Sequence, residues 1–156
     1  SNSPLRGQKG SVYEGGHRVP CVMQWKGRIP AGTISQEVAT CMDLLPTFAH
    51  LAGADVPQDR VIDGHNILSL LEARPGAKAP YQAFFYNHDG VGVRKGKWKY
   101  VRGRKGGLFD LSKDIGERKD LRKQYPEVQQ LEAMLADFDT DIQRHTRPAG
   151  RISAEL

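Results

Sequence analysis

The residues with the clearest chemical potential lie in one short stretch, residues 4–20, which reads PLRGQKGSVYEGGHRVP. Its lysine, Lys9, stands next to Gly10 and two residues after Gly7. Glycine allows positive φ and a close approach of the backbone to a ligand, so such a loop can present an ammonium group to an anion. The same composition is typical of an ordinary surface turn with solvated charges. The spacing alone leaves both interpretations open.

The residue order excludes several common sites. A P-loop ends in Gly-Lys-Ser/Thr, whereas here Lys9 precedes Gly10, and no G-x-G-x-x-G follows a strand pattern. The histidines lack H-x-x-x-H spacing and the cysteines lack C-x-x-C spacing, so the sequence predicts no metal site of these kinds. We expect Cys21 and Cys41, which stand in apolar runs, to be buried free thiols.

The composition is that of an ordinary globular chain with a basic excess. The 156 residues are 38% hydrophobic and 26% charged. No apolar run approaches the roughly 20 residues of a membrane helix, so we expect no membrane partner. The first residue is Ser and no leader pattern is visible, which predicts a processed or excised chain. The net charge of +5 fits an anionic substrate, a nucleic acid or a polyanionic glycan equally well.

The first half of the sequence predicts short strands and helices. Apolar runs indicate short strands at 19–25 and 35–39, a helix at 43–51 and a helical turn at 67–71. The helix would bury one apolar face, made of Leu44, Leu45, Phe48 and Leu51. A Pro/Gly/Ala-rich linker at 74–80 is the best internal boundary.

The second half predicts a small sheet and one helix. Four β-prone runs separated by glycine turns indicate an antiparallel meander, at 83–86, 91–94, 98–101 and 108–111. A helix should begin at Pro126 and end near Arg144. Its apolar stripe consists of Val128, Leu131, Leu135, Phe138 and Ile142. Packing this helix on the sheet buries both apolar faces, and residues 146–156 would form a frayed tail.

The stretch at 4–20 resembles the lysine-bearing segment of the type I sulfatases, which share the alkaline-phosphatase-like fold. Their wording is close to P-L-R-G-G-K-G-T-x-Y-E-G-G-x-R-V-P, from which Gln8 and Ser11 depart, while His17 occupies a variable position. Residues 108–121 are similar to the family's L-Y-D-L-x-x-D-P-x-E-x-x-N-L. Residues 42–47 and 62–64 match further family segments in the same order.

The resemblance implies an α/β (α+β) protein, of which this chain is the C-terminal third. Residues 1–73 would end the large α/β domain and residues 74–80 would form the linker. Residues 81–145 would form a small C-terminal subdomain of antiparallel sheet plus helix. Many family members are exported to the periplasm, lysosome or exterior, and the sequence itself assigns no compartment.

The resemblance also implies a reaction. In this family a formylglycine made from Cys or Ser in a C/S-x-P/A-x-R motif attacks sulfate esters, while a divalent cation, usually calcium, helps to hold the sulfate. Lys9 would then be a catalytic, sulfate-binding residue. His17 and His88 are candidate substrate-binding residues at the rim. The formylglycine and metal ligands lie upstream in the family, so we expect no metal ligand here and no hydrolysis by the isolated chain.

The expected substrate is a sulfate ester, either an aryl sulfate or a sulfated glycan. We also expect self-association through the edges of a truncated domain, at residues 19–25 and 37–41.

A second hypothesis is a non-catalytic module that binds a polyanion or a nucleic acid through residues 94–105. Trp98 and Tyr100 alternate there with basic residues, a pattern typical of single-strand binding. The same alternation favours an ordinary strand with Trp98 and Tyr100 inward and Lys97 and Lys99 outward. The family often has a lysine-rich strand at this place, which favours the ordinary strand over the binding module. Nucleic acid is therefore not an expected partner.

Overall fold

The structure is a computed structural model that describes residues 2–146. Its described residues form two compact units: residues 2–18 together with 85–146, here unit 1, and residues 19–84, here unit 2. The lysine-bearing segment therefore groups with the C-terminal residues and not with those that follow it. The predicted linker at 74–80 lies inside unit 2 and stays a prediction about the longer protein.

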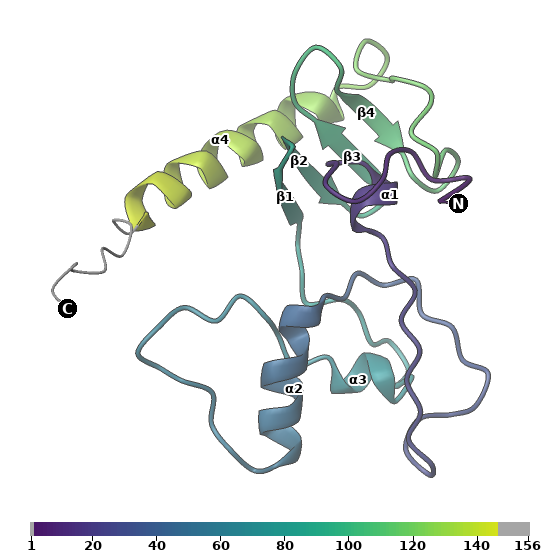
Figure 1. The fold of residues 1–156 in the computed structure, drawn as a ribbon, viewed down its shortest axis with the longest axis vertical. Helices are drawn as coiled ribbons and strands as arrows, with labels where there is room; N and C mark the ends of the chain where they lie inside the picture. The colour runs from purple at the N-terminus through teal and green to yellow at the C-terminus, as the bar shows by residue number, and fades with distance from the viewer. Residues whose placement is uncertain (1, 147–156) are drawn as a thin grey trace, which may run out of the picture. The chain divides into compact units, whose positions relative to one another are not determined.

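Unit 1 is built on a four-stranded sheet in the order β1-β2-β3-β4 (Figure 1). The strands are β1 (Phe84–His88), β2 (Gly90–Lys95), β3 (Trp98–Val101) and β4 (Gly107–Asp110). Both β2–β3 and β3–β4 pair antiparallel, with Tyr100 opposite Val93 on one side and Leu108 on the other. Gly96 turns the chain between β2 and β3 with φ of 57°, a conformation that favours glycine. The predicted meander is confirmed.

Helix α4 (Glu127–His145) covers one face of this sheet, as the sequence predicts. Leu131 and Leu135 are buried, and the Phe138 ring stacks on Phe85 with centroids 4.4 Å apart. The Tyr100 hydroxyl lies 3.3 Å from the Glu132 carboxylate on the helix. Leu131, Leu135 and Phe138 thus form a single core with one sheet face, whereas Ile142, at the end of the predicted apolar stripe, is exposed.

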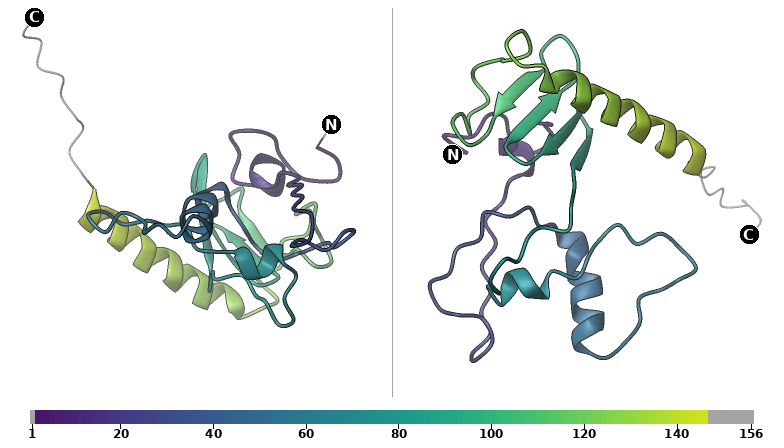
Figure 2. Two further views of the ribbon diagram at one scale, coloured as in Figure 1. Left: turned by 90° about the horizontal axis from the view of Figure 1, so that it is seen from below. Right: turned by 180° about the vertical axis from the view of Figure 1, so that it is seen from behind.

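The lysine-bearing segment and helix α1 (Glu14–His17) cover the opposite face of the sheet (Figures 1 and 2). Val12 is buried against Gly90 and Gly92, where a Cβ would touch its side chain. The Tyr13 hydroxyl donates to the Lys105 carbonyl at 2.6 Å, and the Arg6 guanidinium donates to the Glu117 carbonyl at 2.9 Å. Both faces of the central strand β3 are therefore covered.

This double cover buries the lysine of β3 that was expected to point outward. Lys99 is 0% exposed, and its Nζ lies 2.9 Å from Glu14 Oε1 and 3.0 Å from Glu117 Oε1. The ammonium also lies 4.4 Å from the centroid of the Tyr86 ring. The outward prediction is correct for Lys97, which is exposed, and wrong for Lys99, because strand alternation assumes that one face meets solvent.

The two glutamates around Lys99 are also joined to each other, through the backbone of Glu14. The Glu14 backbone N–H donates to Glu117 Oε2 at 2.7 Å, and Arg18 Nε donates to Glu14 Oε2 at 2.9 Å. Burial by itself would raise the pKa of Glu14, but Lys99 and Arg18 outweigh it and lower that pKa. Burial raises the pKa of Glu117 despite the attraction of Lys99. We name Lys99, Glu14 and Glu117 the buried ion cluster.

Unit 2 is organised by one buried carboxylate. It contains η1 (Cys41–Asp43), α2 (Leu44–Leu51) and α3 (Leu68–Leu71). The Asp43 carboxylate accepts hydrogen bonds from the backbone N–H groups of Thr40 at 2.7 Å and His65 at 2.8 Å, and from the Tyr81 hydroxyl. Burial and Asp43 raise the pKa of Tyr81 to about 12. Asp43 thus closes the capping box of η1 with Thr40 and holds the loop that leads to α3.

Several predictions for unit 2 are wrong. Residues 19–25 and 35–39 form no strand, and Val22 is 93% exposed. The predicted helix is present, yet Leu45 and Phe48 on its apolar face are exposed. Cys21 and Cys41 are exposed free thiols. An apolar run forms a strand only with a partner to pair with, and the described part of the chain supplies none.

The described helices include none that is long and apolar enough to cross a bilayer. The predicted tail at 147–156 lies outside the described residues.

Replacing Leu135 by Ala should lower the free energy of unfolding by about 2–5 kcal/mol, because it leaves a cavity between α4 and the sheet. Ile142→Ala on the same helix is the matched control, since Ile142 is exposed and should change that free energy by no more than about 1 kcal/mol. Denaturant titration measures both. Equal losses in the two variants would contradict the assigned face of α4.

Replacing Lys99 by Met should lower the free energy of unfolding at pH 7 by about 3–5 kcal/mol, because two buried carboxylates lose their counter-charge. Burial already raises the pKa of Glu117, and loss of Lys99 raises the pKa of both carboxylates further, because Lys99 is the main group that opposes the effect of burial. Their penalty is therefore absent at acid pH and grows as pH rises through the raised pKa. Titrations at pH 7 and near pH 4.5 should show the deficit shrinking on acidification, whereas the exposed Lys97→Met should show no such pH dependence.

Candidate functional site

Lys9 lies at the tip of a turn that two glycines make possible. The Ser11 N–H donates to the Gln8 carbonyl at 3.0 Å, which closes a turn with Lys9 in second position. Gly10 in third position has φ of 89°, as a type II turn requires. Lys9 is exposed, so its ammonium is available to a ligand.

The Gly15-Gly16 pair serves packing rather than contact with a ligand. A Cβ on Gly15 would clash with the carbonyl oxygen of Gly7, and one on Gly16 would clash with that of Ser11. The Gly15 N–H donates to the Arg6 carbonyl at 2.7 Å. The turn that carries Lys9 therefore packs directly against α1. This helix is in turn fixed to the sheet by the ion pair between Glu14 and Lys99 of β3.

The structure brings the three predicted site residues into one neighbourhood. His88 ends β1, and a Cβ placed on Gly10 would lie 3.8 Å from its Nε2. The His17 ring meets the Tyr86 ring edge-on, with centroids 5.0 Å apart. Partial burial, the Lys99 ammonium and His88 lower the pKa of His17, while Glu14 opposes them. Lys9, His17 and His88 thus share one region of unit 1.

This arrangement has groups that suit an anion, but none of Lys9, His17 and His88 is a Ser or Cys nucleophile. It offers one flexible ammonium and two exposed imidazoles, which suit an oxyanion and neighbouring hydrogen-bonding groups. Among residues 2–146, no three His, Cys, Asp or Glu side chains are placed to hold a metal ion. The expectation that metal ligands lie elsewhere remains a prediction about the longer protein.

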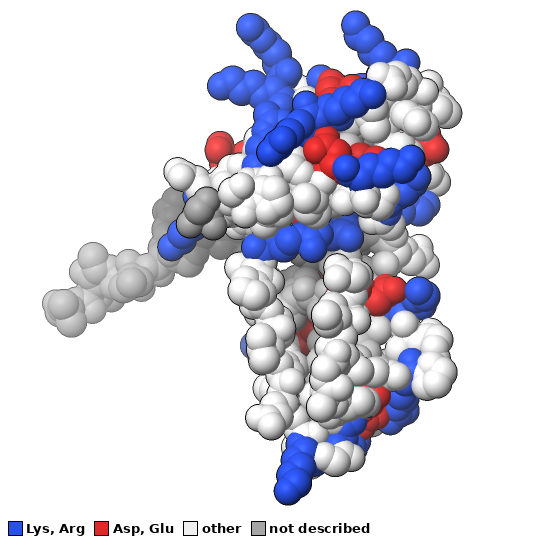
Figure 3. Space-filling model, turned by 90° about the vertical axis from the view of Figure 1, so that its right-hand side faces the viewer, with Lys and Arg blue, Asp and Glu red and all other residues white. Residues whose placement is uncertain are grey.

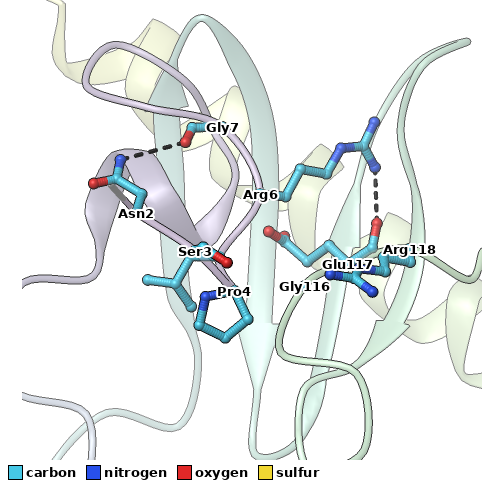
Figure 4. Close-up of a pocket in the computed structure, with 9 residues that line it drawn as sticks. Asn2, Ser3, Pro4, Arg6, Gly7, Gly116, Glu117 and Arg118 are labelled. Carbon is cyan, nitrogen blue, oxygen red and sulfur yellow. Dashed lines mark hydrogen bonds between the residues drawn. The ribbon is translucent and has the colours of Figure 1, made fainter.

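An open hollow of about 620 Å³ lies beside this region but does not include it (Figure 4). It is lined by residues 2–7 and 116–118, and the Arg6 guanidinium bonded to the Glu117 carbonyl crosses it. Asn2 Nδ2 donates to the Gly15 carbonyl at 3.0 Å, so this amide supports the turn. None of the three predicted site residues, Lys9, His17 and His88, lines the hollow.

Unit 1 carries a strong local charge without an aromatic platform. Residues 94–123 contain twelve Lys or Arg and four Asp or Glu, and Figure 3 shows many such basic side chains projecting into solvent. Tyr100 is buried, however, and the half-buried Trp98 packs on Tyr125 with ring centroids 4.9 Å apart. Base stacking requires exposed aromatic faces, so the nucleic-acid hypothesis loses its main support.

Sequence reasoning missed the buried ion cluster behind the site. Glu14 pairs with Arg18 four residues later, but its other partner, Lys99, is 85 residues away. Glu117 stands in a loop and has φ of 50°, so no periodic pattern marks it as buried. Only the tertiary cover of both sheet faces reveals the cluster.

Comparison with known proteins finds sulfatases. The chain is 39% identical to mouse (Mus musculus) steryl-sulfatase over 98 residues, which cover 63% of this chain and 15% of that protein. It is 41% identical to an arylsulfatase of Hemicentrotus pulcherrimus over 99 residues, covering 62% and 17%. The chain therefore spans only about a sixth of the length of these relatives.

Solved sulfatase structures share its fold. The crystal structure of Ps i-CgsB in complex with k-i-k-neocarrahexaose is 28% identical, with a TM-score of 0.75 over 90% of this chain and 33% of that chain. The PsFucS1 sulfatase from Pseudoalteromonas sp. is 22% identical, with a TM-score of 0.79 over 93% and 34%, and this likeness concerns the fold alone. The predicted fold class, the C-terminal part of a sulfatase fold, is confirmed.

The family described as N-sulphoglucosamine sulphohydrolase, C-terminal, matches residues 8–144. That match begins in the turn that carries Lys9 and extends into the last turn of α4, so it includes Lys9, His17 and His88 and residues of both units. The chain belongs to this family, the C-terminal region of the sulfatases.

Proposed function

We propose that this chain is the C-terminal part of an enzyme that hydrolyses sulfate esters, and that Lys9 binds a sulfate oxygen in it. The observation that carries the proposal is the position of Lys9. It is the exposed tip of a glycine-supported turn, pressed onto a helix that is anchored to the sheet. The turn belongs to the segment by which the chain resembles sulfatases.

The chemistry explains why a held lysine is useful. Hydrolysis of a sulfate ester breaks a bond to the leaving oxygen, and negative charge rests on the sulfate oxygens and the leaving group. A cation that is already in place when this charge develops lowers the barrier without reorganising. Lys9 supplies such a charge, and its turn restricts the backbone from which the side chain extends.

A formylglycine nucleophile and a divalent cation, usually calcium, are what the family resemblance adds. When present, the formylglycine would supply the nucleophile that attacks sulfur, and the cation would supply further positive charge beside the sulfate oxygens. The described residues of this chain do not fit either group, since no ligand cluster exists and neither cysteine stands in the C/S-x-P/A-x-R motif. We therefore propose that both lie in other parts of the full protein.

The proposed substrate class is a sulfated glycan, with aryl sulfates as the alternative. A related structure at 28% identity is named as a complex with k-i-k-neocarrahexaose, and the basic loops of unit 1 suit a polyanion. We propose that His17 and His88 contact the alcohol part of the substrate, because they lie in the neighbourhood of the Lys9 turn.

Replacing Lys9 by Ala in the full-length protein should lower kcat/KM for a chromogenic aryl sulfate or a sulfated oligosaccharide by about 10²- to 10³-fold, since a charge that stabilises the transition state is lost. Lys113→Ala is the control, because Lys113 is also exposed but lies in the loop after β4. Initial rates across substrate concentrations measure the effect. Unchanged kcat/KM in Lys9→Ala would refute the assigned role.

The 156-residue chain by itself should not hydrolyse these substrates, because its described residues contain no nucleophile motif and no metal-binding cluster. The assay compares the purified chain with the full-length protein, with and without added calcium. Calcium-dependent turnover by the chain alone would show that the missing groups are not required.

A further inference from the structure

Lys99 and His17 contact the same aromatic ring. The Lys99 ammonium lies 4.4 Å from the Tyr86 centroid, and the His17 ring meets Tyr86 edge-on at 5.0 Å. Lys99 is fully buried, whereas His17 is at the surface. A buried cation and an exposed imidazole are thus joined through one side chain.

A second connection runs through helix α1. This helix has only four residues, and Gly15 and Gly16 between its ends carry no side chains. Glu14 at one end is held by Lys99 at 2.9 Å and by its own N–H bond to Glu117 at 2.7 Å. The place of His17, one helical turn later, therefore depends on how Glu14 is anchored.

The charged and aromatic groups that face His17 come from three elements. Glu14 lies on the same helix, Tyr86 and His88 lie on β1, and Lys99 lies on β3. Partial burial, Lys99 and His88 disfavour the imidazolium, and Glu14 favours it, with a net lowering of the pKa of His17. Of the two groups that disfavour protonation of His17, His88 and Lys99, it is Lys99 that carries the paired, buried positive charge.

We propose that Lys99 is a positioning residue for His17. Through Glu14 and Tyr86 it fixes the imidazole near the Lys9 turn as an uncharged acceptor for a hydroxyl group of the substrate. An imidazolium has only donors, whereas a neutral imidazole has one acceptor nitrogen that a sugar hydroxyl can use. The role in substrate binding rests on the proposed sulfatase function, but the effect of Lys99 on His17 does not.

The test measures the protonation of His17 in the full-length protein, with and without the cluster charges. Diethyl pyrocarbonate acylates only neutral imidazole, so peptide mass spectrometry of its reaction rate against pH gives the half-reactivity pH of each histidine. We expect Lys99→Met to raise this pH for His17, because a repelling charge is removed. We expect Glu14→Gln to lower it, because an attracting charge is removed and Lys99 remains.

The opposite signs separate positioning by charge from simple loosening of the fold. Loosening of α1 would move His17 toward the ordinary histidine value, and so upward, in both variants. Glu14→Gln keeps the shape of the side chain and carries the test even where Lys99→Met fails to fold. Lys97→Met on the exposed side of β3 should leave His17 unchanged, and His65 in unit 2 should not move in any variant.

Activity gives the second measurement. In both variants the limb of the kcat/KM pH profile that depends on His17 should move with its half-reactivity pH. Lys99→Met should also lower kcat/KM at the optimum by up to about 10²-fold through misplacement of α1.

Shifts of His17 in the same direction in both variants, or no shift in either, would overturn the role of Lys99 even if the enzyme hydrolyses sulfate esters. Opposite shifts in a protein without that activity would instead support the electrostatic role and contradict the proposed function.

Discussion

A fully enclosed ammonium group requires compensating charge, and this requirement holds unit 1 together. Moving an unpaired charge from water to a protein interior is so unfavourable that the charge must be paired or lost. Lys99 meets this condition with Glu14, from the segment after the Lys9 turn, and Glu117, from the loop after β4. With Arg18 on Glu14, two positive and two negative groups balance. Three distant stretches of chain are thereby fixed to each other.

Such a cluster adds specificity more than stability. Replacing all members of the cluster together by apolar side chains of similar volume could give equal stability, because desolvation consumes much of the attraction within a buried ion pair, whereas removing one member leaves the others unpaired. Hydrogen bonds with fixed directions, however, allow only one placement of α1 on the sheet, with the Glu14 N–H on Glu117 and its carboxylate on Lys99. The position of α1 in turn determines the position of the Lys9 turn. The backbone of Gly15 and Gly16 packs directly against the carbonyl groups of Gly7 and Ser11 on either side of Lys9.

The regular elements of unit 1 were predictable because their signals are local. Period-two alternation and glycine turns mark β2, β3 and β4, and a period of 3.6 marks α4 with Leu131 and Leu135 inward. The same rule failed at Lys99, because alternation assigns one face to solvent and both faces of β3 are covered. The prediction of a strand at residues 19–25 was also wrong. An apolar run forms a strand only when a second strand pairs with it, and the run itself does not show whether such a strand is present. The neighbourhood of Lys9, His17 and His88 rests on tertiary packing, which a sequence pattern does not contain.

The long separation between the partners of Lys99 has a consequence for biosynthesis. Glu14 and Lys99 are 85 residues apart, and Glu14 and Glu117 are 103 apart. During translation the Lys9 turn leaves the ribosome long before its anchors exist, so α1 has nothing to dock on until the last strand and its following loop are made. Closure of so long a loop is slow and depends on the end of the chain. A nascent chain released before Glu117 would contain Lys9 but not the contacts that anchor α1, so the placement of the Lys9 turn requires synthesis to continue past Glu117.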